Sequence, residues 1–249
     1  MLCEGETNGK TKLKNTLETR IEKLEKENAQ LRGDLFTIGR RVAHDLRTPL
    51  GGISISIELL KELLANNPEA AGAIQSLNTS LDDLSRLIKA FSLLAKASAN
   101  PPSLEPVAMG QIVWAVIQQH ERTTLKRGAA VGAPDDWLMV SGNSGWLEFI
   151  WWSLLANALQ HGGLKIQLGW SKEKGAFRFW VQDNGEGVSA PTRALLFQPF
   201  DSLHQPSSTR GLGLSIVRRL VELQGGRCGY EVSKEGGQCF YFTLPETND

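Results

Sequence analysis

The chain has 249 residues, and its 41% hydrophobic content is enough to fill the core of one or two domains. It carries 27 Lys and Arg residues against 27 Asp and Glu residues, so no net charge favours nucleic acid or an acidic membrane. Its longest apolar runs are shorter than the ~20 residues of a membrane helix, and the N-terminus lacks the apolar core of a signal peptide. We therefore expect a cytoplasmic chain that binds no nucleic acid and does not insert into a membrane.

The N-terminal part of the chain has the apolar spacing of a coiled coil, with alternate intervals of four and three residues. The seam consists of Leu17, Ile21, Leu24, Leu31, Leu35, Ile38 and Val42. Asn28 occupies the remaining core position. A buried Asn at such a position fixes the register and favours two strands, so we expect a parallel dimer, with a frayed seam as the alternative.

The same apolar stripe continues to Leu64, which predicts one helix of about 50 residues up to the sequence NNP. Pro68 fits the first turn of a second helix, whose apolar residues from Ile74 to Phe91 again alternate at three and four. A helical hairpin with one apolar seam per helix leaves that seam exposed to water, whereas two copies close it as a four-helix bundle. The hairpin therefore also predicts a homodimer.

Beyond the helical hairpin the sequence changes character at ASANPPSLEP, and short strands such as KIQLGW, AFRFWVQ and CFYFTL alternate with amphipathic helices. This order predicts an α/β sandwich in which helices cover one face of a mixed sheet, and an α+β chain overall. Cys228 and Cys239 flank an expected hairpin turn without lying opposite each other, which favours unpaired thiols. The predicted parts are a tail and coiled coil over 1–37, a helical hairpin over 38–98, a linker over 99–104 and a second domain over 105–249.

One histidine of the first predicted helix has the surroundings of a nucleophile. His44 lies about 200° around the helix from both Val42 and Leu46, on the side opposite the apolar stripe, so we expect it to be exposed. An imidazole nitrogen attacks phosphorus only if its other nitrogen keeps the proton, and the adjacent Asp45 can stabilise that arrangement. Pro49 removes a helical hydrogen bond and is expected to kink the helix here.

The segment AHDLRTPL, residues 43–50, resembles the H-box of sensor histidine kinases, which transfer phosphate from ATP to histidine and then to a receiver aspartate. The resemblance implies that His44 is the phosphorylated residue. It also implies that a response regulator docks on the helical bundle to receive the phosphoryl group. Thr48 resembles the threonine with which the family positions water to dephosphorylate that regulator.

The segment SGWLEFIWWSLLANALQH, residues 144–161, resembles the N-box of the GHKL ATP-binding fold found in these kinases. The resemblance implies that Asn157 ligates a Mg²⁺ ion bridging the phosphates. An uncharged amide oxygen suits a metal already neutralised by phosphates and waters. On a helix, Ser153, Gln160 and His161 gather on the same polar stripe as Asn157, and we expect Gln160 and His161 to contact the nucleotide.

The segment FWVQDNGEGV resembles the G1 box of that fold and is expected to end a strand in Asp183. The resemblance assigns Asp183 to the exocyclic amine of adenine, because a carboxylate accepts that hydrogen bond and guanine offers an acceptor there instead. Gly185 and Gly187 let the backbone approach a planar ligand.

The segment STRGLGLSIVRRLVELQGG resembles the G2 box, and the free N–H groups at the start of its helix are suited to phosphate oxygens. The residues expected at the phosphates are Gly211, Leu212, Gly213 and Leu214. Between the boxes, Phe197 and Phe200 have the spacing of the family's F-box, in what looks like a mobile lid. Arg210 either steadies the γ-phosphate as a catalytic residue or faces solvent.

Two other functions compete with an ATP-dependent protein-histidine kinase. The first is an ATP-hydrolysing GHKL clamp; such enzymes activate water with a glutamate four residues before the metal-binding asparagine, where this chain has Ser153. The second is a dimeric pseudokinase scaffold that no longer transfers phosphate. The presence of His44, Asn157 and Asp183 favours the kinase, with ATP and Mg²⁺ as its cofactors.

Overall fold

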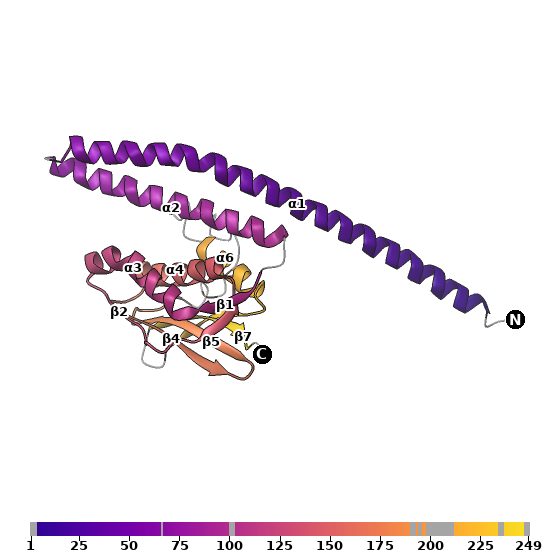
Figure 1. Cartoon of the computed structure of the whole chain (residues 1–249). Coiled ribbons are helices and arrows are strands. Elements are labelled where there is room, and N and C mark those ends of the chain that lie inside the picture. The colour runs from indigo at the N-terminus through magenta and orange to yellow at the C-terminus, as the bar shows by residue number, and fades with distance from the viewer. Residues whose placement is uncertain are drawn as a thin grey trace.

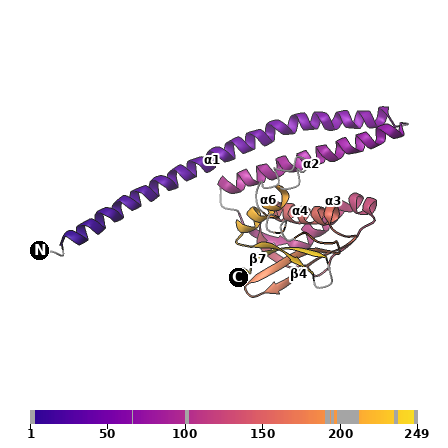
Figure 2. The same cartoon turned by 180° about the vertical axis from the view of Figure 1, so that it is seen from behind.

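A helical hairpin lies beside an α/β sandwich in the computed structural model (Figure 1). The structure describes residues 4–65, 67–99, 103–189, 193, 196–197, 212–233 and 237–246. Figure 2, seen from behind, shows the same arrangement of the two parts. The predicted α+β class is confirmed.

The hairpin is formed by α1 (Glu4–Leu63) and α2 (Pro68–Ala99). The N-terminal half of α1 extends well beyond the end of α2 (Figure 1). Helix α1 starts further toward the N-terminus than the coiled-coil pattern indicates, and it runs through Pro49 without interruption. The turn is followed by Asn67, whose side-chain oxygen accepts a hydrogen bond from the amide of Ala70 and so caps α2.

The apolar seam of the hairpin divides into a buried set and an exposed set. The residues buried between the two helices are Gly39, Ala43, Leu50 and Ile57 of α1 and Ile74, Ile88 and Ala95 of α2. The exposed set comprises Leu46, Ile53 and Leu60 of α1 and Leu77, Leu84 and Phe91 of α2. Only part of the heptad pattern is therefore satisfied within one chain, and an apolar face stays open to solvent.

The second part is built on a five-stranded mixed sheet in the order β2-β4-β5-β7-β6. The strands are β2 (Ala130–Gly132), β4 (Lys165–Glu173), β5 (Ala176–Asp183), β6 (Cys228–Val232) and β7 (Gln238–Pro245). The β2–β4 pair is parallel and the other pairs are antiparallel. Cys228 pairs with Phe242 and Cys239 with Glu231, so the two thiols are not opposite each other, and both are free as expected.

Three helices cover one face of this sheet and lie between it and α2 (Figures 1 and 2). They are α3 (Met109–Arg127), α4 (Ser144–His161) and α6 (Leu212–Glu222). A separate pair of antiparallel strands, β1 (Glu105–Ala108) and β3 (Met139–Gly142), which the sequence did not indicate, leads into the starts of α3 and α4. The predicted sandwich with helices on one face is confirmed.

The core between sheet and helices is centred on Trp151 of α4, which is fully buried. Its ring meets Phe179 and Phe242 of the sheet edge-on, at centroid distances of 6.2 and 5.4 Å. Its indole N–H donates to the sulfur of Met109 at 3.1 Å, so the polar atom is satisfied. This packing fixes α4 rigidly against β5, and both elements end at the candidate site.

The helical hairpin touches the sandwich through α2, which packs beside α6. Leu93 of α2 packs against the apolar core of the sandwich. In the parts of the chain that the structure describes, no helix has both the length and the apolar character that a membrane crossing requires.

Candidate active site

His44 lies on the solvent side of α1, with 77% of its side chain exposed, as its helical phase predicts. The preceding residue, Ala43, is buried against α2, which turns the histidine away from the hairpin core. Nδ1 of His44 lies 3.3 Å from Oδ1 of Asp45, a distance at which a protonated Nδ1 donates to the carboxylate. The ring nitrogen left for chemistry is then Nε2.

Two charged or polar neighbours share the surface around His44. Arg41, one turn earlier, has its Nε 3.9 Å from Oδ2 of Asp45, so the carboxylate lies between a guanidinium and the imidazole. Thr48, one turn after His44, is exposed on the same side of the helix. The imidazole and these neighbours are therefore accessible from solvent.

Asp183 is the buried acid of the sandwich domain, with a relative exposure of 2% at the end of β5. Its Oδ1 accepts hydrogen bonds from the backbone N–H of Gly163 at 3.0 Å and of Gly185 at 2.8 Å. Its Oδ2 is buried and has no hydrogen-bond partner among the residues that the structure describes. An unsatisfied buried carboxylate oxygen is costly, so this atom is suited to a donor that a ligand supplies.

Glycines surround Asp183 and leave no space for side chains. A Cβ atom at Gly162 would lie 2.4 Å from Cγ of Asp183, and one at Gly163 would lie 2.1 Å from Oδ1 of Asn184. Both glycines follow α4 directly, so the close approach brings the end of that helix to the end of β5. This Gly-Gly pair was not predicted as part of the site, although it directly follows the segment that resembles the N-box.

The predicted polar residues of α4 do not share one environment. Asn157 is half-buried, and Gln160 and His161 are exposed. Ser153, in contrast, is 7% exposed, and its hydroxyl has no hydrogen-bond partner among the described residues, so it is more deeply buried than the later members of the stripe. The buried apolar residues of α4 around Trp151 hold this part of the helix against the sheet.

The glycines and aromatic residues expected around the nucleotide are placed as follows. Gly185 is half-buried beside Asp183, and Gly187 is exposed with φ +86°. Phe197 is half-buried and packs on Phe240 of the sheet, with ring centroids 6.3 Å apart. The neighbouring amide of Val188 donates to the hydroxyl of Tyr230 at 3.2 Å, which ties the segment after Gly187 to β6.

The expected phosphate segment is described only from its helix onward. Leu212 is the first residue of α6, Gly213 is half-buried and Leu214 is buried against the core. The start of α6 therefore has backbone N–H groups without intrahelical partners, which suits an anion. Phe200, Arg210 and Gly211 lie outside the described residues.

The donor and acceptor groups of the sandwich domain fit a purine nucleotide with a bound cation. The free Oδ2 of Asp183 matches an exocyclic amine, and the α6 N-terminus matches phosphate. Asn157 offers an amide oxygen at the half-buried end of α4, a group that Mg²⁺ accepts when phosphates and waters complete its shell.

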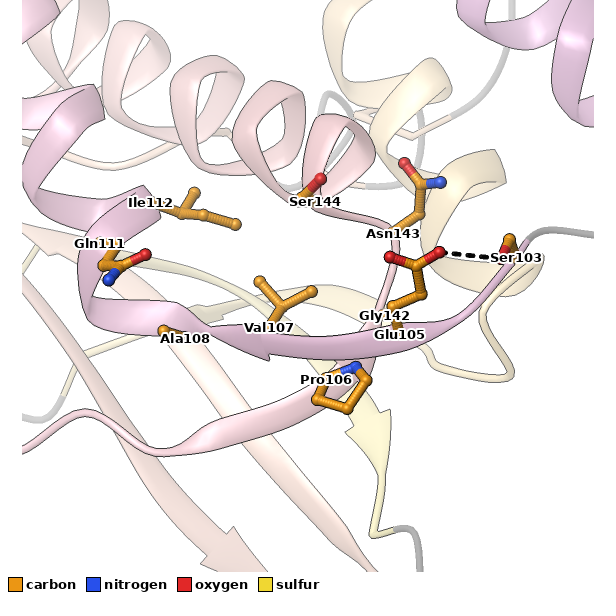
Figure 3. A pocket seen from close by; sticks show the side chains of 10 residues that line it. All are labelled: Ser103, Glu105, Pro106, Val107, Ala108, Gln111, Ile112, Gly142, Asn143 and Ser144. Carbon is orange, nitrogen blue, oxygen red and sulfur yellow. Dashed lines mark hydrogen bonds between the residues drawn. The ribbon is translucent and has the colours of Figure 1, made fainter.

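A distinct cavity of about 290 Å³ lies at the other end of α4. Figure 3 shows that its lining comes from β1, the start of α3, the end of β3 and the start of α4. Glu105 accepts a hydrogen bond from the Ser103 hydroxyl at 3.3 Å at its rim. The cavity lies next to Asn143 and Ser144, at the start of α4, whereas the residues expected to bind the nucleotide begin at Asn157 near the end of that helix. The cavity is therefore not part of the candidate nucleotide site.

Comparison with known proteins identifies two family models along the chain. Residues 40–100 match the His Kinase A (phospho-acceptor) domain, and residues 142–248 match the Histidine kinase-, DNA gyrase B-, and HSP90-like ATPase family. The first match contains His44 and the second contains Asn157 and Asp183. The residues singled out from the sequence thus fall in two matched families that histidine kinases combine.

Curated relatives and solved structures agree with this division. The chain is 29% identical over 240 residues to the methanogenesis regulatory histidine kinase FilI of Methanothrix harundinacea, covering 93% of this chain and 26% of that protein. It is 24% identical to the sensor histidine kinase CpxA of Escherichia coli, covering 93% of this chain and 50% of the relative. The crystal structure of full-length ShkA in complex with AMPPNP matches with a TM-score of 0.63 and 26% identity, over 85% of this chain and 46% of that chain. The chain therefore spans half or less of the length of these proteins.

Proposed function

The chain belongs to the histidine kinases, in which a phospho-acceptor domain precedes an ATPase domain, and from this premise we propose that it transfers the γ-phosphoryl group of ATP to His44. The observation that carries the proposal is the pairing of two unlike sites in one chain. An exposed imidazole is held by Asp45 on the helical hairpin, and a buried carboxylate with one free oxygen, Asp183, lies in the sandwich. The hairpin supplies the nucleophile, and the sandwich supplies the nucleotide site.

In the proposed reaction, the lone pair of Nε2 of His44 attacks the γ-phosphorus of ATP. The bond between that phosphorus and the bridging oxygen of ADP breaks, the new N–P bond forms, and ADP leaves with the electron pair. Positive charge develops on the imidazole, and Asp45 stabilises it while retaining the proton of Nδ1 in its hydrogen bond. The neutral imidazole, with its lone pair on Nε2, is the reactant, and the phosphorylated ring loses its charge when the Nδ1 proton later passes to the Asp45 carboxylate or to water.

The nucleotide is held, in this proposal, by groups at the ends of three elements. Oδ2 of Asp183 accepts a hydrogen bond from the adenine amine, and the N-terminal amides of α6, around Leu212 to Leu214, bind phosphate oxygens. Asn157 holds Mg²⁺, which when bound neutralises phosphate charge. Further proposed contacts are Gln160, His161, Gly185, Gly187, Phe197, Phe200 and Gly211, with Arg210 at the γ-phosphate.

We assign the working form to a homodimer because the hairpin leaves an apolar face open. Leu46, Ile53 and Leu60 of α1 are exposed on the stripe whose Leu50 and Ile57 are buried in the hairpin. Leu77, Leu84 and Phe91 are likewise exposed on the stripe of α2 whose Ile74 and Ile88 are buried. A second hairpin packed on this face completes a four-helix bundle, and the exposed Leu17, Ile21 and Leu24 extend the contact as a coiled coil.

The phosphoryl group then passes to an aspartate of a response regulator receiver domain, which docks on the exposed surface around His44. Thr48 lies exposed on that surface one turn away, which supports a role in holding water against the phosphorylated receiver. The proposed divisions are a coiled coil over 1–37, a phosphotransfer hairpin over 38–98, a linker over 99–104 and an ATP-binding domain over 105–249. Because the proposed reaction uses ATP, we propose that these parts of the chain lie in the cytoplasm.

The test is incubation with ATP carrying a radiolabelled γ-phosphate and with Mg²⁺, combined with nucleotide titration. Wild type is expected to become labelled. His44→Gln is expected to bind ATP with unchanged affinity and carry no label, since glutamine has no nucleophilic nitrogen. Asp183→Asn is expected to lose binding and label together, because an amide nitrogen or a neutral oxygen replaces the carboxylate acceptor. Labelling of His44→Gln at the wild-type level would contradict the proposal.

A further inference from the structure

Arg127, the last residue of α3, binds the end of the helix that leads to the nucleotide site. Its Nη2 donates to the carbonyl oxygen of Gly162 at 2.5 Å, and its Nη1 lies 3.5 Å from the carbonyl oxygen of Ala158. Both carbonyls belong to the C-terminal end of α4, where a cation is favourable. The side chain is half-buried, so the guanidinium is partly shielded from water.

The Gly162–Gly163 peptide group is held from both sides. Its carbonyl oxygen, on Gly162, accepts from Arg127, and its N–H, on Gly163, donates to Oδ1 of Asp183 at 3.0 Å. A charged donor on the carbonyl polarises the peptide and strengthens the N–H as a donor. Arg127 and Asp183 are thus linked through a single planar amide, although 56 positions separate them in the chain (183 minus 127).

The packing around this amide is close. A side chain at Gly162 would overlap Asp183, and one at Gly163 would overlap Asn184. The next contact along the chain is the amide of Lys165, which donates to Oδ1 of Asn184 at 2.8 Å. A change in the tilt of the Gly162–Gly163 peptide would withdraw one of the two N–H donors that hold Oδ1 of Asp183, leaving only that of Gly185, and would let the carboxylate turn.

We propose that Arg127 is a positioning residue for nucleotide recognition: it orients the Gly162–Gly163 peptide so that Oδ1 of Asp183 is occupied and Oδ2 remains free for an amine of the ligand. The inference rests on the proposed function, in which that amine belongs to adenine. Arg127 does not touch the nucleotide in this account. Its effect is confined to the part of the binding free energy that depends on the 6-amino group.

The experiment compares two ligands and three variants of the full chain. The ligands are ATP and an analogue that carries hydrogen in place of the 6-amino group, measured by calorimetric titration. The variants are Arg127→Gln, Arg127→Lys and the control Lys126→Gln, which removes an exposed cation from the adjacent position of the same helix. Wild type and the control are expected to prefer ATP by about tenfold or more, the effect of one hydrogen bond to a charged acceptor.

Arg127→Gln is expected to bind the analogue with little change, which also shows that it folds, and to lose most of the preference for ATP. Arg127→Lys, which keeps a charged donor, is expected to retain an intermediate preference. In the nucleotide-free protein, the amide hydrogen of Gly163 is expected to exchange faster in Arg127→Gln than in the Lys126→Gln control. This second measurement does not depend on ATP.

Equal loss of affinity for both ligands in Arg127→Gln would overturn the inference and give Arg127 a purely structural role. An unchanged preference for ATP together with unchanged exchange at Gly163 would also overturn it. A wild-type protein without any preference for ATP over the analogue would overturn the adenine contact of Asp183 itself. Because that last failure is seen in wild type alone, it is distinguished from a failure of Arg127.

Discussion

The imidazole of His44 and the carboxylate of Asp45 form a surface pair in which Nδ1 and Oδ1 are 3.3 Å apart. Adjacent residues on a helix point about 100° apart, so this contact requires both side chains to bend toward each other. In the proposed reaction, Nδ1 keeps its proton and donates it to this contact, and the lone pair of Nε2 is left to attack phosphorus.

Replacing Asp45 with Asn should slow phosphorylation of His44 by about tenfold or more without changing ATP affinity, because the amide oxygen accepts the hydrogen bond from Nδ1 but carries no charge to stabilise the developing cation. The initial rate of labelling at saturating ATP is the measurement. Glu58→Gln is the matched control, since Glu58 is an exposed acid of the same helix that pairs with Lys61. A rate equal to that of the control would remove Asp45 from the mechanism.

Asn157→Ala should abolish Mg²⁺-dependent labelling while the dimer stays intact. The side chain is half-buried at the ligand end of α4, and its removal leaves the apolar core around Trp151 untouched. Labelling and sedimentation on the same sample separate the two effects. Full labelling in the variant would refute the assignment of Asn157 as the metal ligand.

Thr48→Ala should retain autophosphorylation and lose the ability to dephosphorylate the partner receiver. The hydroxyl is exposed one turn from His44 and is proposed to hold water, a role that the reaction of the imidazole with ATP does not require. The two activities are measured separately, starting from ATP and from a phosphorylated receiver. Equal loss of both would show that Thr48 has no separate function.

Cys228 should react slowly with iodoacetamide in the folded protein. Burial raises the pKa of its thiol from 9.0 to about 11, so at pH 8 its thiolate fraction is about a hundredfold lower than that of an unshifted thiol. The neutral thiol is favoured in the folded state, so this group stabilises the fold fully below pH 9 and the contribution is lost as pH rises toward 11. Alkylation followed by peptide mass spectrometry from pH 7 to about 11 checks the rise. A plateau already near pH 9 would contradict it.

The sequence predicts those features that depend on local periodicity. The exposure of His44 follows from its phase relative to Val42 and Leu46, and the second helix begins at Pro68 because proline suits a first turn. The end of β5 at Asp183 follows from the turn residues after it. These properties are set by neighbours within a few positions.

Features that depend on long-range contacts were not predictable in this way. Ser153 has the helical phase of the polar stripe, but packing of α4 against the sheet buries it. The contacts of Arg127 and of Gly163 with their partners join residues 35 and 20 positions apart. Periodicity identifies which face of a helix is apolar, but it does not identify which element that face will meet.

The central claim is tested most directly by the chemical stability of the phosphorylated protein. The protein is incubated with γ-labelled ATP and Mg²⁺ and then treated with acid or with base. A phosphoramidate on imidazole has a leaving nitrogen that acid protonates. The account predicts that the label is lost in acid, survives in base, and is absent from His44→Gln. Label that survives acid, label that persists in His44→Gln, or a wild-type protein that binds ATP without becoming labelled would contradict the account.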